Sequence, residues 1–203
     1  MYALITDGSI TKHLSGNRGI QVGDIKYARD IYSKWTEAER NAIGLFEIIW
    51  DNDNKKDEEY YSNTNQTYTY DADAGTVTAT YGDATARAHA DTTWSQQDSD
   101  DGDLPSDKSV GDVKVEGLKT QHKRIIKQQA SGLLTDTDWY VIKATDVESY
   151  SVPSAITTYR ATVRTKSNDM EVLIDACSTV DELAALYVYT DGTRPLGEFP
   201  EAV

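Results

Sequence analysis

Apolar and polar positions alternate along the first ninety residues, which is the pattern of strands with one buried face. The clearest stretch runs from Tyr60 to Tyr81, with Asp73-Ala-Gly75 at the place of a hairpin turn. Residues 2–14 repeat the pattern around Asp7-Gly8, a dipeptide that accepts the positive φ of a tight turn. The pattern therefore predicts two antiparallel hairpins.

One short helix is expected between these hairpins. In Thr36-x-x-Glu39 each side chain can satisfy a free backbone N–H of the other residue, an arrangement that opens helices. The pattern ends this helix near Gly44 and predicts a strand over Leu45–Trp50.

The composition changes in residues 91–112, which are rich in Asp, Ser and Gly and contain Pro105. Such a segment buries little apolar surface, so it predicts an acidic linker that is mobile unless a partner holds it. It separates a β-rich module, residues 1–90, from a second module, residues 113–203.

Apolar residues in the second module recur at helical spacing. One stripe comprises Leu118, Ile125, Ile126, Ala130, Leu133 and Leu134, and a second, after Pro153, comprises Ile156, Tyr159 and Val163. Thr179-Val-Asp-Glu182 predicts a short third helix, and the Pro-containing tail over residues 194–200 predicts an extended arm. The expected fold class is α+β: antiparallel hairpins with one short helix, then a helical hairpin plus a short third helix.

Composition narrows the function. The 203 residues carry a net charge of −14, whereas a protein that neutralises phosphates needs concentrated Lys and Arg. We expect no nucleic-acid partner. The start of the chain has neither a basic region nor a long apolar run, so we also expect no signal peptide, no membrane contact and a cytosolic location. A basic stripe could pair with the acidic linker, meet an acidic partner or form an exposed helix face: Lys114, Lys119, Lys123, Arg124 and Lys127.

No catalytic or metal-binding signature is present. The three His are far apart, and Cys177 stands alone, so we expect no metal site and no cofactor. Asp98-x-Asp100-x-Gly102 fails the EF-hand pattern at its third ligand, although Ca²⁺ binding across Asp98–Asp103 stays open. We expect a protein that is not an enzyme. The alternative is a Ca²⁺-dependent Asp/Glu hydrolase of host surface glycans, with two carboxyl groups about 5–9 Å apart.

Aromatic side chains are the more informative candidates, because a flat ring buries much area at an interface and still places a polar atom. The predicted partner-binding residues are Tyr68, Tyr70, Tyr81 and Trp94. Core packing is expected for Trp35, Trp50 and Trp139.

The most informative motif is Leu133-Leu-Thr-Asp-Thr-Asp-Trp139, followed by Tyr159-Arg160 and Arg164. Thr137 or Asp138 can cap the turn after the first helix, and Trp139 can fold back on Leu133 and Leu134. Tyr159 falls on the apolar stripe, and Arg160 or Arg164 can bridge to Asp136 or Asp138. The motif therefore predicts the lock of a helical hairpin.

This order of motifs resembles tail-fibre assembly proteins of tailed bacteriophages, where a leucine pair precedes Ser/Thr-Asp-Trp and a later helix carries Tyr-Arg and a second Arg. Arg194-Pro-Leu-Gly-Glu198 is similar to the ending of small tail-region proteins of marine phages. The resemblance covers about residues 118–199.

It implies a non-enzymatic virion component or assembly chaperone that binds a fibre or baseplate subunit. Such a protein is expected in the host cytoplasm during assembly or in the virion tail, and a homo-oligomer is possible.

Overall fold

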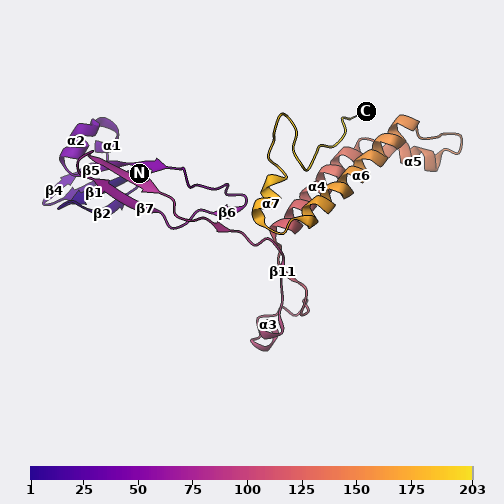
Figure 1. Ribbon diagram of the computed structural model, residues 1–203, viewed down its shortest axis with the longest axis horizontal. Helices are drawn as coiled ribbons and strands as arrows, with labels where there is room; N and C mark the ends of the chain where they lie inside the picture. Colours follow the sequence, from indigo (N-terminus) through magenta and orange to yellow (C-terminus); the bar gives the residue numbers. More distant parts are fainter. Residues whose placement is uncertain (203) are drawn as a thin grey trace. The chain divides into compact units, whose positions relative to one another are not determined.

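The computed structural model describes residues 1–202 and divides the chain into two compact units, Met1–Thr85 and Ala86–Val203 (Figure 1). Unit 1 is rich in antiparallel strands and unit 2 is mainly helical, so the mixed α+β class is confirmed. Among residues 1–202, no helix combines the length and the apolar content needed to cross a bilayer.

A five-stranded sheet in the order β2-β1-β5-β8-β7 forms the body of unit 1. Its strands are β1 (Tyr2–Thr6), β2 (Ser9–Leu14), β5 (Leu45–Asp51), β7 (Thr67–Asp71) and β8 (Thr76–Thr80). Both predicted hairpins are present, and Asp7 and Gly8 take φ values of 51° and 75° in the first turn. The parallel pairing of β5 with β8 was not predicted, because local alternation carries no information on distant partners.

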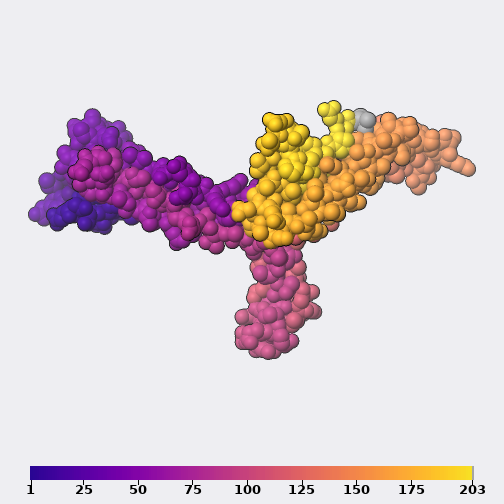
Figure 2. Space-filling model, in the orientation of Figure 1, coloured from indigo at the N-terminus to yellow at the C-terminus, as the bar shows by residue number. Residues whose placement is uncertain are grey.

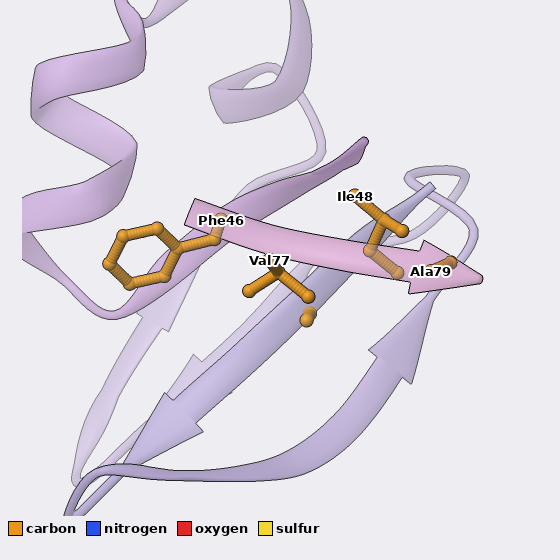
Figure 3. Packing of buried hydrophobic residues seen from close by; sticks show 5 residues of the cluster. Phe46, Ile48, Val77 and Ala79 are labelled. Carbon is orange, nitrogen blue, oxygen red and sulfur yellow. The ribbon is translucent and has the colours of Figure 1, made fainter. Parts of the chain in front are cut away.

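One face of this sheet holds a buried hydrophobic cluster. Phe46, Ile48, Val77 and Ala79 meet there with Ala3 (Figure 3). Two short helices, α1 (Ile31–Lys34) and α2 (Glu37–Ala42), lie between β4 and β5 in the chain. The capping box of α2 forms with both of its hydrogen bonds, as predicted. Short strands complete the unit: β3 (Ile20–Val22), β4 (Ile25–Tyr27) and β6 (Tyr61–Ser62). Strand β9 (Thr85–Ala86) begins at the last residue of unit 1 and pairs with β6.

The structure differs from expectation over residues 91–112, which belong to unit 2 and are folded. Strands β10 (Thr92–Thr93) and β11 (Val113–Val115) pair antiparallel, and α3 (Gln96–Asp100) lies between them. Asp98 completes a capping box with Ser95 and forms an ion pair with Lys114, and Trp94 N donates to Asp112 O over 2.9 Å. Asp98, one of the acidic side chains that indicated a linker, thus caps a helix and forms an ion pair within a closed hairpin.

Four helices complete unit 2: α4 (Leu118–Thr135), α5 (Asp138–Asp146), α6 (Ser154–Ala176) and α7 (Val180–Ala185). Helices α4 and α6 form the predicted hairpin, and α6 runs unbroken through Ser167-Asn168 (Figure 1). Helix α5 was not predicted. Leu196 of the extended tail is fully buried, and Phe199 packs against the hairpin near Tyr159.

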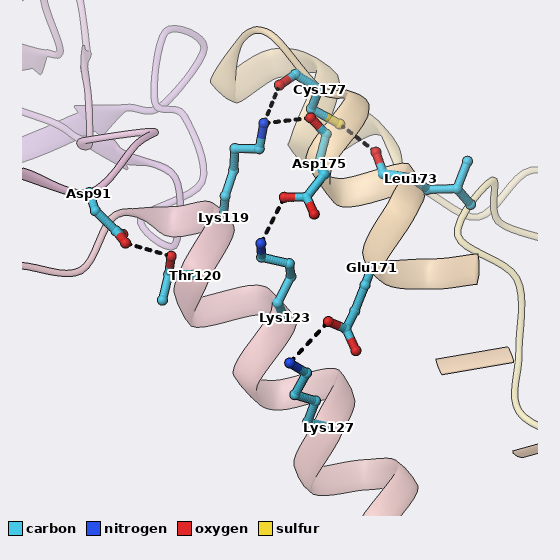
Figure 4. A network of polar contacts seen from close by, with 9 residues as sticks. All are labelled: Asp91, Lys119, Thr120, Lys123, Lys127, Glu171, Leu173, Asp175 and Cys177. Carbon is cyan, nitrogen blue, oxygen red and sulfur yellow. Dashed lines mark hydrogen bonds and ion pairs between the residues drawn. The ribbon is translucent and has the colours of Figure 1, made fainter. Parts of the chain in front are cut away.

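Three lysines of the basic stripe join α4 to the C-terminal part of α6 and the residue after it (Figure 4). Lys119 Nζ donates to the backbone carbonyls of Asp175 and Cys177, at 2.6 and 2.9 Å. It thus provides a hydrogen-bond donor at the C-terminal end of α6, where helix carbonyls lack partners within the helix. Lys123 pairs with Asp175 at 2.8 Å, and Lys127 pairs with Glu171 at 3.2 Å. Lys123 and Lys127 therefore meet acidic groups of their own unit, and Lys119 meets backbone carbonyls.

Candidate functional site

The lock predicted from the motif forms at the end of the helical hairpin, and Arg160 is its centre. This buried side chain donates from Nη1 to Leu134 O at 2.9 Å and to Thr137 Oγ1 at 2.6 Å. Its Nη2 forms an ion pair with Asp138 at 2.7 Å. Of the predicted bridges from Arg160 or Arg164 to Asp136 or Asp138, the one from Arg160 to Asp138 forms, and it ties α6 to the start of α5.

The apolar part of the motif packs beneath this lock. Tyr159 is buried with Ala130 and Val163, and Leu133 and Leu134 pack against them. The burial of the Tyr159 ring confirms its predicted place on the apolar stripe of α6. The Tyr159 hydroxyl donates to Leu133 O at 3.4 Å. Thr137 caps the turn after α4, as predicted, because its hydroxyl donates to Leu134 O at 2.8 Å. It makes no side-chain cap hydrogen bond to α5.

The prediction of core packing for Trp139 was wrong, because this side chain is 50% exposed. Asp138 begins α5, and this places Tyr140 and Ala144, four residues apart, on the more buried side of the helix. Trp139 therefore faces outward. Its ring lies 3.9 Å from the Tyr140 ring, and Lys143 Nζ lies 5.6 Å from its centroid.

Further apolar side chains are exposed on α5 and just after it. Ile142 is 61% exposed, and Val141 and Val147 are each 41% exposed. At 100° per residue, Ile142 lies opposite the side of Tyr140 and Ala144, with Trp139 and Val141 on either side of it. We call Trp139, Val141, Ile142 and Val147 the tip surface, which belongs to the orange end of unit 2 in Figure 2.

A signal for the tip surface was present in the sequence. Trp139-Tyr-Val-Ile142 places four large apolar side chains in succession, and one face of a helix cannot bury four consecutive residues. The prediction for Trp139 did not take its apolar neighbours into account.

Arg164 does not join the lock. It is exposed, and its Nη1 donates to Arg160 O over a long 3.4 Å. Within residues 1–202 it forms no ion pair with a carboxylate. Its side chain lines a groove of about 500 Å³ between α4 and α6.

The aromatic residues predicted to bind a partner are half-buried and have ring contacts inside their own units. In unit 1, Tyr68 lies 4.1 Å from the His13 ring, Tyr70 lies 5.1 Å from Phe46, and Tyr81 lies 5.7 Å from Trp50. In unit 2, Lys114 Nζ lies 4.4 Å from the Trp94 ring centroid. Their partner binding stays a prediction, and the tip surface offers larger exposed side chains.

The titratable groups give no metal site in the described part of the chain, and the pKa values of Asp98 and Cys177 are shifted by contacts within the fold. Among residues 1–202, no group of three or more His, Cys, Asp and Glu side chains is placed to hold a metal ion. Lys114, with hydrogen bonds from Ser95, holds the pKa of Asp98 well below its usual range. Burial raises the pKa of the Cys177 thiol, which favours the unreactive protonated form.

Comparisons of the chain with protein-family models, curated proteins and solved structures gave no match. Function is therefore inferred from the residues of the chain itself.

Proposed function

We propose that this chain is a non-enzymatic tail or tail-fibre-associated protein of a tailed bacteriophage. It binds a fibre or baseplate subunit, as a virion component or as an assembly chaperone, and the tip surface is its contact. The observation that carries the proposal is the exposure of Trp139 and Ile142, at 50% and 61%, on a helix whose first turn is locked in place by Arg160.

The chemistry of the tip surface supports a protein partner. Trp is among the residues that most often dominate the binding energy of protein interfaces, and charged groups are depleted at interface centres. A large aromatic side chain has about 150–250 Å² of surface that burial can cover, and an aliphatic side chain has less. The exposed parts of the four tip-surface side chains therefore offer roughly 300 Å² of apolar area. A stable interface buries about 800 Å² per partner, so the tip surface can form the centre of an interface with a polar rim around it.

The lock supports the same proposal. Ordering a flexible loop on binding costs free energy, and a preorganised surface avoids that cost. Arg160 fixes α5 through groups on both sides of the connection, Leu134 O and Asp138. In this account the residues of the phage-like motif position the contact, and the neighbouring outward side chains make it.

The test is co-expression of the full chain with the fibre subunit of the same phage, followed by size-exclusion chromatography. The wild-type chain should co-elute with the subunit, and Trp139→Ser/Ile142→Ser should not. A matched control is Val172→Ser/Leu173→Ser, which removes apolar side chains that are 67% and 37% exposed on α6.

Failure of the wild-type chain to bind fibre and baseplate subunits would overturn the proposal. If the wild-type chain does bind, mass spectrometry of purified particles distinguishes the two forms of the proposal, because a virion component is present in the particles and a departing chaperone is not.

A further inference from the structure

The groove between α4 and α6 carries polar side chains that the fold leaves unused. We call it the Arg164 groove; its lining includes Lys127, Ser131, Arg160, Arg164, Ser167 and Glu171. Ser167 lines this groove and is 6% exposed, and within residues 1–202 its hydroxyl makes no hydrogen bond although its oxygen still reaches solvent. A hydroxyl can donate and accept, so it offers a hydrogen-bond partner to a polar occupant of the groove.

The charges in the groove favour an acidic occupant. Lys127 is paired with Glu171, and Arg160 is paired with Asp138. Arg164, the third basic side chain of the groove, forms no ion pair in the described part of the chain. A guanidinium can bind a carboxylate through two parallel N–H hydrogen bonds. Ala130 and Leu134 add an apolar wall to the same groove.

Unit 2 also carries a segment with the complementary chemistry. Residues 92–115, which we call the acidic arm, contain six Asp and two Lys, a net charge of −4. Asp98 pairs with Lys114, but four exposed carboxylates form no ion pair within residues 1–202: Asp100, Asp101, Asp103 and Asp107.

The arm is built to present these groups. Its base is closed by β10 and β11, and Ser95 and Asp98 cap α3. Its apolar side chains are nevertheless unusually open, since Val110, Val113 and Val115 are 47%, 45% and 57% exposed. It is the pink and magenta projection of unit 2 in Figure 2. Asp100 and Asp101 accept hydrogen bonds from Gln96 and Gln97 at 2.8 Å, so the arm is ordered, but its four carboxylates meet no cation in the described part of the chain.

We propose that the Arg164 groove of one copy binds the acidic arm of a second copy. This contact is separate from the tip surface. Each copy carries a net charge of −14, but at physiological ionic strength the Debye length is about 8 Å, so long-range repulsion is screened more strongly than close pairs in the groove. Because groove and arm are different surfaces, the contact is heterologous and each pair of copies keeps one free arm and one free groove.

Sedimentation equilibrium of the full chain at physiological ionic strength tests this. The wild-type chain should associate with increasing concentration. Arg164→Glu, in the groove, and Asp100→Asn/Asp101→Asn/Asp103→Asn/Asp107→Asn, in the arm, should each weaken association at least tenfold. The arm variant lowers the magnitude of the net charge from 14 to 10, so reduced repulsion cannot explain its loss of association.

Mixing the two variants gives the sharpest result. The Arg164→Glu chain keeps an intact arm and the arm variant keeps an intact groove, so an equimolar mixture should form dimers that grow no further. Arg29→Glu makes the same charge change at an exposed site in unit 1 and should associate like the wild type.

Circular dichroism confirms that each variant is folded. A wild-type chain that stays monomeric at all accessible concentrations would overturn the proposal. Wild-type association of the Arg164→Glu chain would also overturn it, as would an equal loss in Arg29→Glu.

Discussion

Replacing Arg160 with Met should destabilise the helical hairpin of unit 2 by about 1.5–3 kcal/mol, the typical contribution of a hydrogen bond to a charged group. Met keeps most of the aliphatic stem and removes the guanidinium, whose Nη1 serves Leu134 O and Thr137 Oγ1. Leu134 O keeps its bonds from Thr137 N and Thr137 Oγ1, at 3.0 and 2.8 Å, so no carbonyl is stranded. The loss therefore stays below the cost of a buried charge left unpaired, about 3–5 kcal/mol.

The ion pair accounts for little of this loss. The Asp138 side chain is 50% exposed, against 10% for Arg160, and exposed pairs contribute about 0–1 kcal/mol. Asp138→Ala should therefore cost less than about 1 kcal/mol, and Arg164→Met should stay within about 0.5 kcal/mol because Arg164 lies outside the lock. Urea unfolding followed by the helical circular dichroism signal would measure all three. A loss for Asp138→Ala as large as that for Arg160→Met would refute this reasoning, because the ion pair would then be the main term.

Two further predictions concern the folding of each unit. Gly44 has φ +78°, and an added Cβ would meet Ile5 O at 2.5 Å, whereas Gly8 has φ +75° and open space. Gly44→Ala should therefore destabilise unit 1 by about 2–3 kcal/mol and Gly8→Ala by about 1 kcal/mol in thermal unfolding; equal losses would exclude the steric contact. In the arm, contacts lower the pKa of Asp98 in the folded state below its ordinary value of about 3.9. The ionised carboxylate therefore stabilises the folded arm fully above the ordinary pKa, and this stabilisation is lost as pH falls through the lowered pKa. The ring NMR signals of Trp94 should hence stay constant from pH 7 to about 5 and change well below pH 4. The Asp98→Asn variant should lack that acid transition. A change near pH 5 in the wild-type chain would contradict the contact of Asp98 with Lys114.

Local patterns predicted the elements whose causes are local. Asp7-Gly8 and the Thr36 capping box each act within a few residues, so the turn and the helix could be read from the sequence. The parallel pairing of β5 and β8 joins residues about thirty positions apart, and alternation gives the faces of a strand but no partner.

The acidic arm and α5 show why composition and single residues can mislead. An Asp-rich segment indicates disorder on average, but Asp98 has specific partners in Ser95 and Lys114 that fold it. Arg160 and Tyr159 could be placed from helical spacing, whereas the fate of Trp139 depended on where α5 begins. The lock was therefore predicted, whereas the exposed surface was not, although the apolar run Trp139-Tyr-Val-Ile142 indicated it.

The affinity of the full chain for the fibre subunit tests the central claim most directly. Isothermal titration calorimetry would compare the wild-type chain with Trp139→Ser/Ile142→Ser and with the control Val172→Ser/Leu173→Ser. Two residues at the centre of an interface should together account for at least about 2.7 kcal/mol, a hundredfold loss of affinity, while the control stays within about twofold. Unchanged affinity in Trp139→Ser/Ile142→Ser, or an equal loss in the control, would contradict a contact through the tip surface.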